Sequence, residues 1–110
     1  MKGSVIAERI KEDIRSRIGK LGFRPALAGI QVGDNAAAES YTQMQSRLAS
    51  ALGFEYRLHR LAAKTSLEEL KRLIAKLNED PAVNGIIVQK PLPNEIDYLA
   101  AVREISPLKD

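Results

Sequence analysis

The most constraining feature of the sequence is an apolar run, residues 27–32, that stops at Gly33 and Asp34 and continues into a segment of helical periodicity. Because the run contains one polar residue, Gln31, and no alternation, it predicts a strand buried on both faces, as in the centre of a parallel sheet. The helix that follows is capped by Asp34 or Asn35 and stopped by Gly53. Its apolar positions are Tyr41, Met44, Leu48 and Leu52. In open α/β sheets the carboxyl ends of strands line the ligand crevice, so the loop after this run is the first candidate for a site.

The rest of the chain continues this alternation of helix and strand. Residues 54–61 alternate between apolar and polar side chains, which predicts a half-exposed edge strand, and residues 85–89 form another apolar strand. An amphipathic helix of about five turns precedes the first strand, with Ser4 available as its cap and Gly19 and Gly22 at its end. Its apolar positions are Ile6, Ile10, Ile14, Ile18 and Leu21.

Two further helices are expected in the second half of the chain. Ser66 and Glu69 form a capping box, which opens a helix that Pro81 closes. The apolar positions of this helix are Leu67, Leu70, Ile74 and Leu77. Pro91 and Pro93, in the string VQKPLP, take the chain out of the sheet before a last short helix. The apolar positions of the last helix are Ile96, Leu99, Val102 and Ile105, and residues 106–110 are expected to form a linker.

Strands and helices in alternation predict one α/β domain with right-handed crossovers and helices on both faces of the sheet. We therefore expect a three-layer α/β/α architecture with a mostly parallel sheet of three to four strands. A chain of 110 residues with 45% hydrophobic content suits a single domain and can bury a core without metals or disulfides.

Composition excludes several classes of function. The chain has no cysteine, which rules out disulfides and thiolate chemistry and, with no secretory leader at Met1, favours a cytoplasmic protein. No apolar stretch is long enough for a membrane span. The net charge of +3 comes from basic and acidic residues that are interspersed, with no basic stripe for nucleic acid. The lone His59 is expected to be solvated, and Arg57, Arg60 and Lys64 to form a charged strand edge.

Polar residues gather where the first and third strands end. Because parallel strands end at one edge of a sheet, we expect these residues to line a small-molecule pocket. The expected lining is Asp34, Asn35, Ser40, Tyr41, Gln45, Gln89 and Lys90. Tyr41 and Gln45 are four residues apart and share a helix face. The alternative is that Tyr41 packs in the core and Gln45 is solvated.

Four motifs carry a resemblance to a known family. They are GSVIAERI near the start, Val32-Gly33 followed by Tyr41 eight residues later, the string VQKPLP, and PLKD at residues 107–110. Together they resemble the N-terminal, folate-binding domain of bifunctional methylenetetrahydrofolate dehydrogenase/methenyltetrahydrofolate cyclohydrolase, over essentially the whole chain. The resemblance implies that residues 1–110 form a folate-binding domain of one-carbon metabolism. The chain departs from the family pattern at Ser4, Ala38, Gln45 and Lys90.

The resemblance also assigns roles to individual residues. The resemblance implies that a tyrosine at the position of Tyr41 stacks on the folate and that Gln89 is both a catalytic and a substrate-binding residue. Pro91 and Leu92 complete the implied substrate site. The family's catalytic lysine, beside Gln89, is replaced here by Gln45. A carboxamide has no accessible proton-transfer equilibrium, so Gln45 is expected to hydrogen-bond a pterin without performing acid–base catalysis. Lys90 follows Gln89 on an extended segment and is expected to point to the opposite face, which argues against its replacing the missing amine.

Cofactor and partner expectations follow from the same resemblance. The full-length family uses NADP, but the sequence has no G-x-G-x-x-G turn, so we expect the NADP-binding Rossmann domain to be absent and no cofactor or metal to be bound by this chain. Hydride transfer by the chain alone is therefore not expected, and a separate NADP-binding domain or chain is a potential partner. A monomer or weak dimer is expected. Three interpretations stay open: a piece of the bifunctional enzyme, a non-catalytic folate-binding or regulatory module, or a purely structural domain.

Overall fold

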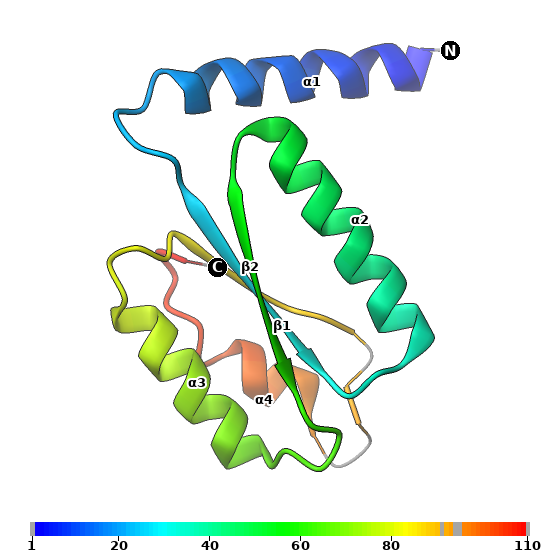
Figure 1. The fold of residues 1–110 in the computed structure, drawn as a ribbon, viewed down its shortest axis with the longest axis vertical. Helices are drawn as coiled ribbons and strands as arrows, with labels where there is room; N and C mark the ends of the chain where they lie inside the picture. Colours follow the sequence, from blue (N-terminus) through cyan, green and yellow to red (C-terminus); the bar gives the residue numbers. More distant parts are fainter. Residues whose placement is uncertain (1, 91, 94–95, 110) are drawn as a thin grey trace.

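The computed structural model describes residues 2–90, 92–93 and 96–109, and the side chains of the first helix from Ala7 onward. In chain order the elements are α1 (Lys2–Gly19), β1 (Ala26–Val32), α2 (Ala36–Leu52), β2 (Glu55–Leu61), α3 (Leu67–Glu79), β3 (Gly85–Val88) and α4 (Tyr98–Val102). The three strands are parallel in the order β2–β1–β3, with α2 on one side of the sheet and α3 and α4 on the other (Figure 1). The predicted α/β fold is confirmed, with β1 at the centre and β2 at an edge. No helix in the described ranges is both long and apolar enough to cross a membrane.

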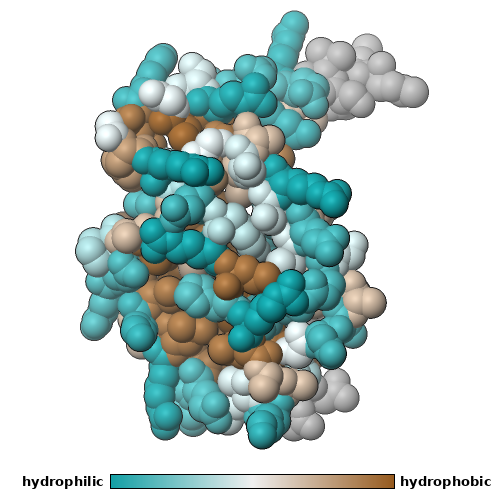
Figure 2. Space-filling model, in the orientation of Figure 1, coloured by the Kyte–Doolittle hydropathy of each residue, from teal (hydrophilic) through white to brown (hydrophobic). Residues whose placement is uncertain are grey.

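The two faces of the sheet differ in chemistry. Successive strand residues point to opposite faces, and one face of β1 packs Ala28, Ile30 and Val32 into the main core cluster with Leu70 and Ile74 of α3. The other face carries Gly29 and Gln31 toward α2. The apolar core therefore lies between the sheet and α3 and α4, whereas the α2 side contains buried polar groups. Figure 2 shows hydrophobic residues gathered over β2 and α3, and again at the turn after α1, on an otherwise mostly hydrophilic face.

Helix α2 begins and ends as predicted. The Asn35 side chain accepts hydrogen bonds from the backbone N–H groups of Ala37 and Ala38, at 2.8 and 3.3 Å, so Asn35 is the N-cap. Gly53 adopts the left-handed conformation (φ 98°) that follows many helix ends. The helix is therefore fixed at both ends by the local sequence.

The face that α2 buries is not the predicted apolar stripe. Of that stripe only Leu52 is buried, whereas Tyr41 is 52% exposed, Met44 56% and Leu48 42%. The other buried positions of α2 are the small residues Ala38, Thr42 and Ala49. Small side chains let the helix approach a sheet face that already carries large polar side chains. The alternative that Tyr41 packs in the core is therefore wrong.

Helix α3 agrees with its sequence pattern. The Ser66 hydroxyl accepts a hydrogen bond from the Glu69 backbone N–H at 3.1 Å, which confirms Ser66 as the N-cap, and it donates to the Glu69 carboxylate at 3.2 Å. Leu70, Ile74 and Leu77 are buried.

The first and last helices differ from expectation in their bounds and in what they bury: of the expected apolar positions, Ile10 and Leu21 are 54% and 45% exposed. Helix α1 starts at Lys2, so Ser4 lies inside its first turn and is not its cap. Helix α4 is only five residues long, with Asp97 as N-cap, and Leu99 is 59% exposed although Ile96 and Ile105 are buried beside it. Both helices are otherwise where the periodicity predicts them.

The segment expected to be a linker is docked on the domain as far as Lys109. The Lys109 carbonyl accepts a hydrogen bond from the backbone N–H of Ile86 in β3 at 2.7 Å. Its ammonium donates to the carbonyls of Leu77 and Asp80 at the end of α3, at 2.8 and 2.7 Å. Lys109 thus adds a charged second donor to carbonyls at the end of α3 that already accept from the backbone N–H groups of Asp80 and Val83. The prediction of a free linker is wrong for residues 106–109, and Asp110 lies outside the described residues.

Candidate functional site

The loops after β1 and β3 meet at one edge of the sheet, as predicted. Gly33 and Asn35, which follow β1, line a hollow of about 400 Å³ together with Leu92 and Pro93, which follow β3. Asp34 also lines it. Gly33 has φ 83°, a conformation that favours glycine, and its N–H bonds the Leu61 carbonyl at the end of β2 at 2.9 Å. Pro91, also predicted for the site, lies outside the described residues.

Two glutamines that are 44 residues apart meet beside this edge. Gln89 lies directly after β3 and is 2% exposed. Its backbone N–H donates to the Ile30 carbonyl at 2.8 Å, which fixes the backbone of Gln89 against β1. Its Nε2 donates to Oε1 of the half-buried Gln45 on α2. It also donates to the hydroxyl of Tyr56 at 3.1 Å. The structure thus brings Gln45 and Gln89 together, and the alternative of a solvated Gln45 is wrong.

Tyr56 reaches this pair by crossing the central strand. It projects from β2 toward the α2 side, and its ring lies over Gly29, where an added Cβ would stand 2.1 Å from the Tyr56 hydroxyl oxygen. Only glycine at position 29 leaves room for the ring. Burial raises the pKa of Tyr56 above its ordinary value, and the hydrogen bond from Gln89 partly opposes that rise. The phenol is therefore a neutral hydrogen-bonding group at physiological pH.

A second polar network fixes the first half of α2 next to the site. Gln31 is fully buried at the end of β1, and its Nε2 donates to the Gly33 carbonyl and to the Glu39 carboxylate, each at 3.0 Å. Its Oε1 accepts from the Thr42 hydroxyl at 2.8 Å. Arg60 of β2 pairs with Glu39, with one Nη2 to Oε2 contact at 3.1 Å. The Arg60 hydrogen bond, and then that from Gln31, lower the pKa of Glu39 below its ordinary value.

Other predicted site residues are dispersed around this edge. Tyr41 lies one helical turn before Gln45 with its ring half exposed, and Ser40 is exposed. The Lys90 ammonium lies 4.4 Å from the centre of the Tyr98 ring, and Tyr98 packs against the core cluster on the α3 side. Lys90 thus points away from Gln89, as its place after Gln89 on an extended segment predicts, and its amine is not at the position of Gln45. Of the expected pocket lining, Asp34 and Asn35 border the hollow of about 400 Å³.

The charged edge on β2 is present, but His59 differs from expectation. Arg57, Arg60 and Lys64 are exposed, as predicted. His59 is half-buried on the face that carries Ile30, and its Nε2 is buried without a hydrogen-bond partner among the described residues. The prediction of a solvated histidine is therefore wrong.

Sequence reasoning missed Tyr56 as a member of the site. The signal was present in two places: Tyr56 is on the apolar side of the alternating strand, and Gly29 interrupts an aliphatic strand, which often marks a close approach of another group. Gln31 was visible as the polar residue in a buried strand. Which of its neighbours satisfy it depends on the packing of α2, which the pattern does not reveal.

The cluster of Gln45, Gln89 and Tyr56 can bind but is poorly suited to proton transfer. Two carboxamides have no accessible proton-transfer equilibrium, and the phenol pKa is raised further from neutrality. These groups can instead donate and accept hydrogen bonds in a partly buried setting, where each bond is strong. The arrangement is a neutral, partly buried polar cluster, with the exposed ring of Tyr41 one helical turn away from Gln45.

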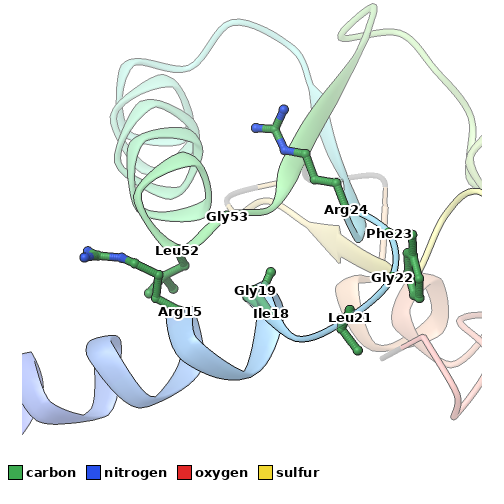
Figure 3. Close-up of a pocket in the computed structure, with 9 residues that line it drawn as sticks. All are labelled: Arg15, Ile18, Gly19, Leu21, Gly22, Phe23, Arg24, Leu52 and Gly53. Atoms are coloured by element: carbon green, nitrogen blue, oxygen red, sulfur yellow. The ribbon is translucent and has the colours of Figure 1, made fainter.

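A second hollow lies at the opposite end of the domain, where α1 meets the end of α2 (Figure 3). It has a volume of about 450 Å³ and is lined by apolar side chains such as Ile18 and Leu52. Its two arginines are already used: Arg15 donates to the Ala51 carbonyl and Arg24 to the Phe54 carbonyl, each at 3.0 Å. With its charged groups engaged and no carboxylate in its lining, this hollow offers less chemistry than the edge at Gln89.

Known proteins similar to this chain agree on one family. The model of the family described as tetrahydrofolate dehydrogenase/cyclohydrolase, catalytic domain, matches residues 1–110. The bifunctional protein FolD of Chlamydia caviae is 39% identical over all of this chain and 38% of its own length. That of Acidiphilium cryptum is 43% identical over 98% of this chain and 39% of its own length. The chain thus spans about two fifths of the curated relatives that it matches.

Solved structures give the same result. The bifunctional enzyme FolD, a methylenetetrahydrofolate dehydrogenase/cyclohydrolase from Campylobacter jejuni, has a TM-score of 0.90 at 32% identity, over 98% of this chain and 39% of its own. The bifunctional dehydrogenase/cyclohydrolase from Thermoplasma acidophilum has a TM-score of 0.85 at 36% identity, over 94% of this chain and 38% of its own. The Trypanosoma brucei enzyme, solved as a complex with NADP and an inhibitor, has a TM-score of 0.85 at 32% identity, over 96% and 37%. The chain belongs to the tetrahydrofolate dehydrogenase/cyclohydrolase catalytic-domain family.

Proposed function

We propose that residues 1–110 are the folate-binding domain of a protein of one-carbon metabolism, and that the edge formed by Tyr41, Gln45, Gln89 and Leu92 holds the folate. The observation that carries the proposal is the hydrogen bond between Gln89 and Gln45. It joins two segments of the fold at the positions where the family resemblance places the catalytic glutamine and lysine. The site lies at the carboxyl ends of parallel strands, where open α/β sheets bind ligands.

Tyr41 supplies the stacking surface in this proposal. Its ring is half exposed one turn of α2 before Gln45, so a flat heterocycle can cover the ring and reach the glutamine pair together. An aromatic stacking contact contributes about 0.5–1.5 kcal/mol beyond the area that it buries. Exposure of Tyr41 is therefore consistent with a ligand-binding role.

Gln45 limits the chemistry that the site can perform. The family's lysine would act as a proton donor and acceptor, and removing one general acid or base costs about a hundred- to ten-thousandfold in rate. Gln45 keeps a hydrogen-bonding group in the same place without an ionisable proton. We therefore propose that the chain binds the folate and that its cyclohydrolase step is impaired. A non-catalytic folate-binding module is the second candidate, and the same substitution favours it.

We propose that the helix N-termini of α2, α3 and α4 do not hold NADP. A dinucleotide pyrophosphate needs free backbone N–H groups at a helix N-terminus, approached through glycines. Asn35 occupies the N-terminus of α2 behind the acidic Asp34, Ser66 and Glu69 occupy that of α3, and Asp97 occupies that of α4. We propose that NADP, where it is used, is held by a domain or chain outside these 110 residues. A cytoplasmic location is proposed from the absence of cysteine.

Calorimetric titration of the 110-residue chain with 5-formyltetrahydrofolate, a stable reduced folate, tests the binding proposal. Saturable binding that is lost in Tyr41→Ala and kept in Met44→Ala supports it, because Met44 is equally exposed on the same helix. No binding by the unmodified chain, or equal loss in both variants, contradicts a folate site at Tyr41.

A gain-of-function substitution separates the two candidate functions. Gln45→Lys restores the family's amine beside Gln89 and should raise the rate of hydrolysis of 5,10-methenyltetrahydrofolate, followed by its absorbance. Gln43→Lys adds the same charge to an exposed position of α2 and serves as the control. A gain specific to position 45 indicates an enzyme site that lost one group. Binding without any gain indicates a non-catalytic module.

A further inference from the structure

The Tyr56 hydroxyl accepts a hydrogen bond from the Gln89 carboxamide, a group that could otherwise rotate about its terminal bond. A glutamine carboxamide can present either its oxygen or its NH₂ group to a ligand, because the two ends have nearly the same shape. The Gln89 NH₂ group has two hydrogens, and both are engaged: one by Gln45 Oε1 and one by the Tyr56 hydroxyl. In this arrangement the oxygen of Gln89 is the end that remains to meet a ligand.

The same bonds set the orientation of Gln45. Its oxygen accepts from Gln89, which leaves its NH₂ group as the end that is free to donate. Among the described residues, neither the Gln45 NH₂ group nor the Gln89 oxygen has another hydrogen-bond partner. The Gln45 NH₂ group, a donor, and the Gln89 oxygen, an acceptor, therefore lie on adjacent side chains.

Gly29 is what allows Tyr56 to take this position. A methyl group there would overlap the Tyr56 hydroxyl and its ring carbon Cζ, at 2.1 and 2.6 Å. Because the backbone at position 29 is buried in the central strand, the Tyr56 ring would have to move away from it to make room for the methyl group. Gly29 and Tyr56 therefore form a matched pair on neighbouring strands, and their effect on the glutamines should be shared.

We infer that Tyr56 is a positioning residue that holds the Gln89 and Gln45 carboxamides in the arrangement seen, in which Gln89 presents an acceptor and Gln45 a donor to the ligand of the site. The inference rests on the proposed folate site and deepens it. It selects ligands that carry a hydrogen-bond donor next to an acceptor on one edge, as the amide and amino groups of a pterin ring do.

The test combines side-chain amide NMR with titration of 5-formyltetrahydrofolate. Tyr56→Phe keeps the ring over Gly29 and removes the hydroxyl, so the fold should be retained. We expect the Gln89 and Gln45 side-chain NH₂ resonances to shift in the free protein, and affinity for the probe to fall about three- to tenfold, as for one neutral hydrogen bond. Tyr98→Phe, which removes a hydroxyl on the far side of the sheet, should change neither.

Gly29→Ala provides an independent arm. It should reproduce the shift and the loss of affinity in the natural background, and it should add no further loss of affinity in Tyr56→Ala, where there is room for the methyl group. Unchanged glutamine resonances together with unchanged affinity in Tyr56→Phe would overturn the inference. Failure of the unmodified chain to bind the probe would overturn the proposed function instead, and the resonances of the free protein would then decide whether Tyr56 holds the glutamines.

Discussion

Replacing Gln31 with leucine should destabilise the domain by about 2 kcal/mol, a value that follows from its contacts. Gln31 is fully buried and bonds Thr42, Gly33 and Glu39. Losing the bonds to Thr42 and Gly33 costs about 1 kcal/mol each, and leaving the buried Thr42 hydroxyl without its acceptor adds about 1 kcal/mol or more. The additional apolar surface that leucine buries offsets about 1 kcal/mol. A loss of this size is a large part of the stability of a small domain.

Glu39 gives this prediction a signature in pH. Its folded-state pKa is lowered first by Arg60 and second by Gln31, so its contribution to stability is present above the unfolded pKa and is lost as pH falls through the folded pKa. Gln31→Leu removes one of the two groups that lower it. The difference in stability between the two proteins should therefore be largest at neutral pH and shrink below about pH 4, where the carboxylate becomes protonated.

Urea unfolding followed by circular dichroism at both pH values measures this difference. Gln43→Leu makes the same chemical change at an exposed position of α2 and should alter the free energy of unfolding by less than about 0.5 kcal/mol. Adding Thr42→Val to Gln31→Leu should recover part of the loss, since no hydroxyl is then left without a partner. A difference below about 0.5 kcal/mol for Gln31→Leu, or one that does not change with pH, would refute the account of this network.

Three further substitutions test how the fold is held, each by the free energy of unfolding in urea. Asn35→Ala removes the cap of α2 and should cost about 1 kcal/mol, whereas Asn35→Ser should cost much less because serine also caps; equal losses would contradict capping. Gly53→Ala forces a side chain into the left-handed region, with its Cβ 3.1 Å from Ile18 Cγ2, and should cost about 1 kcal/mol or more; no loss would show that α1 moves away freely. Ile74→Ala empties part of the core against the sheet and should cost about 2–5 kcal/mol, and a loss under about 1 kcal/mol would mean that the core collapses around the gap.

The architecture could be predicted from sequence because each element carries its own local signal. The strand at 26–32 lacks alternation because it is central and covered on both faces, and the strand at 55–61 alternates because it is at an edge. Caps at Asn35 and Ser66 and the stop at Gly53 are properties of a few adjacent residues. The pairing of Gln89 with the helix after β1 also follows, because parallel strands end together. These features need no knowledge of long-range packing.

What could not be predicted depends on contacts between distant residues. Lys109 belongs by sequence to the expected linker, and its role at the end of α3 is visible only once the chain has returned to Leu77 and Asp80. His59 reads as polar by alternation, yet its strand register with Ile30 turns it toward the core. In both cases a polar residue type predicts a solvent-exposed side chain, whereas the tertiary structure places the side chain against the rest of the domain.

Helix α2 shows why the apolar pattern did not predict which residues face the sheet and which face the site. Hydrophobic spacing assigns the core to Tyr41, Met44 and Leu48, but the sheet face beneath α2 is already filled by Tyr56 and by the buried Gln31. A helix that laid large side chains on that face would stand further from the sheet, and Gln45 would then lose its bond to Gln89. The small side chains on its buried face keep the two glutamines in contact and turn the aromatic ring of Tyr41 outward. The packing of small side chains against the sheet, which the periodicity did not predict, therefore brings Gln45 and Gln89 together and leaves the Tyr41 ring exposed.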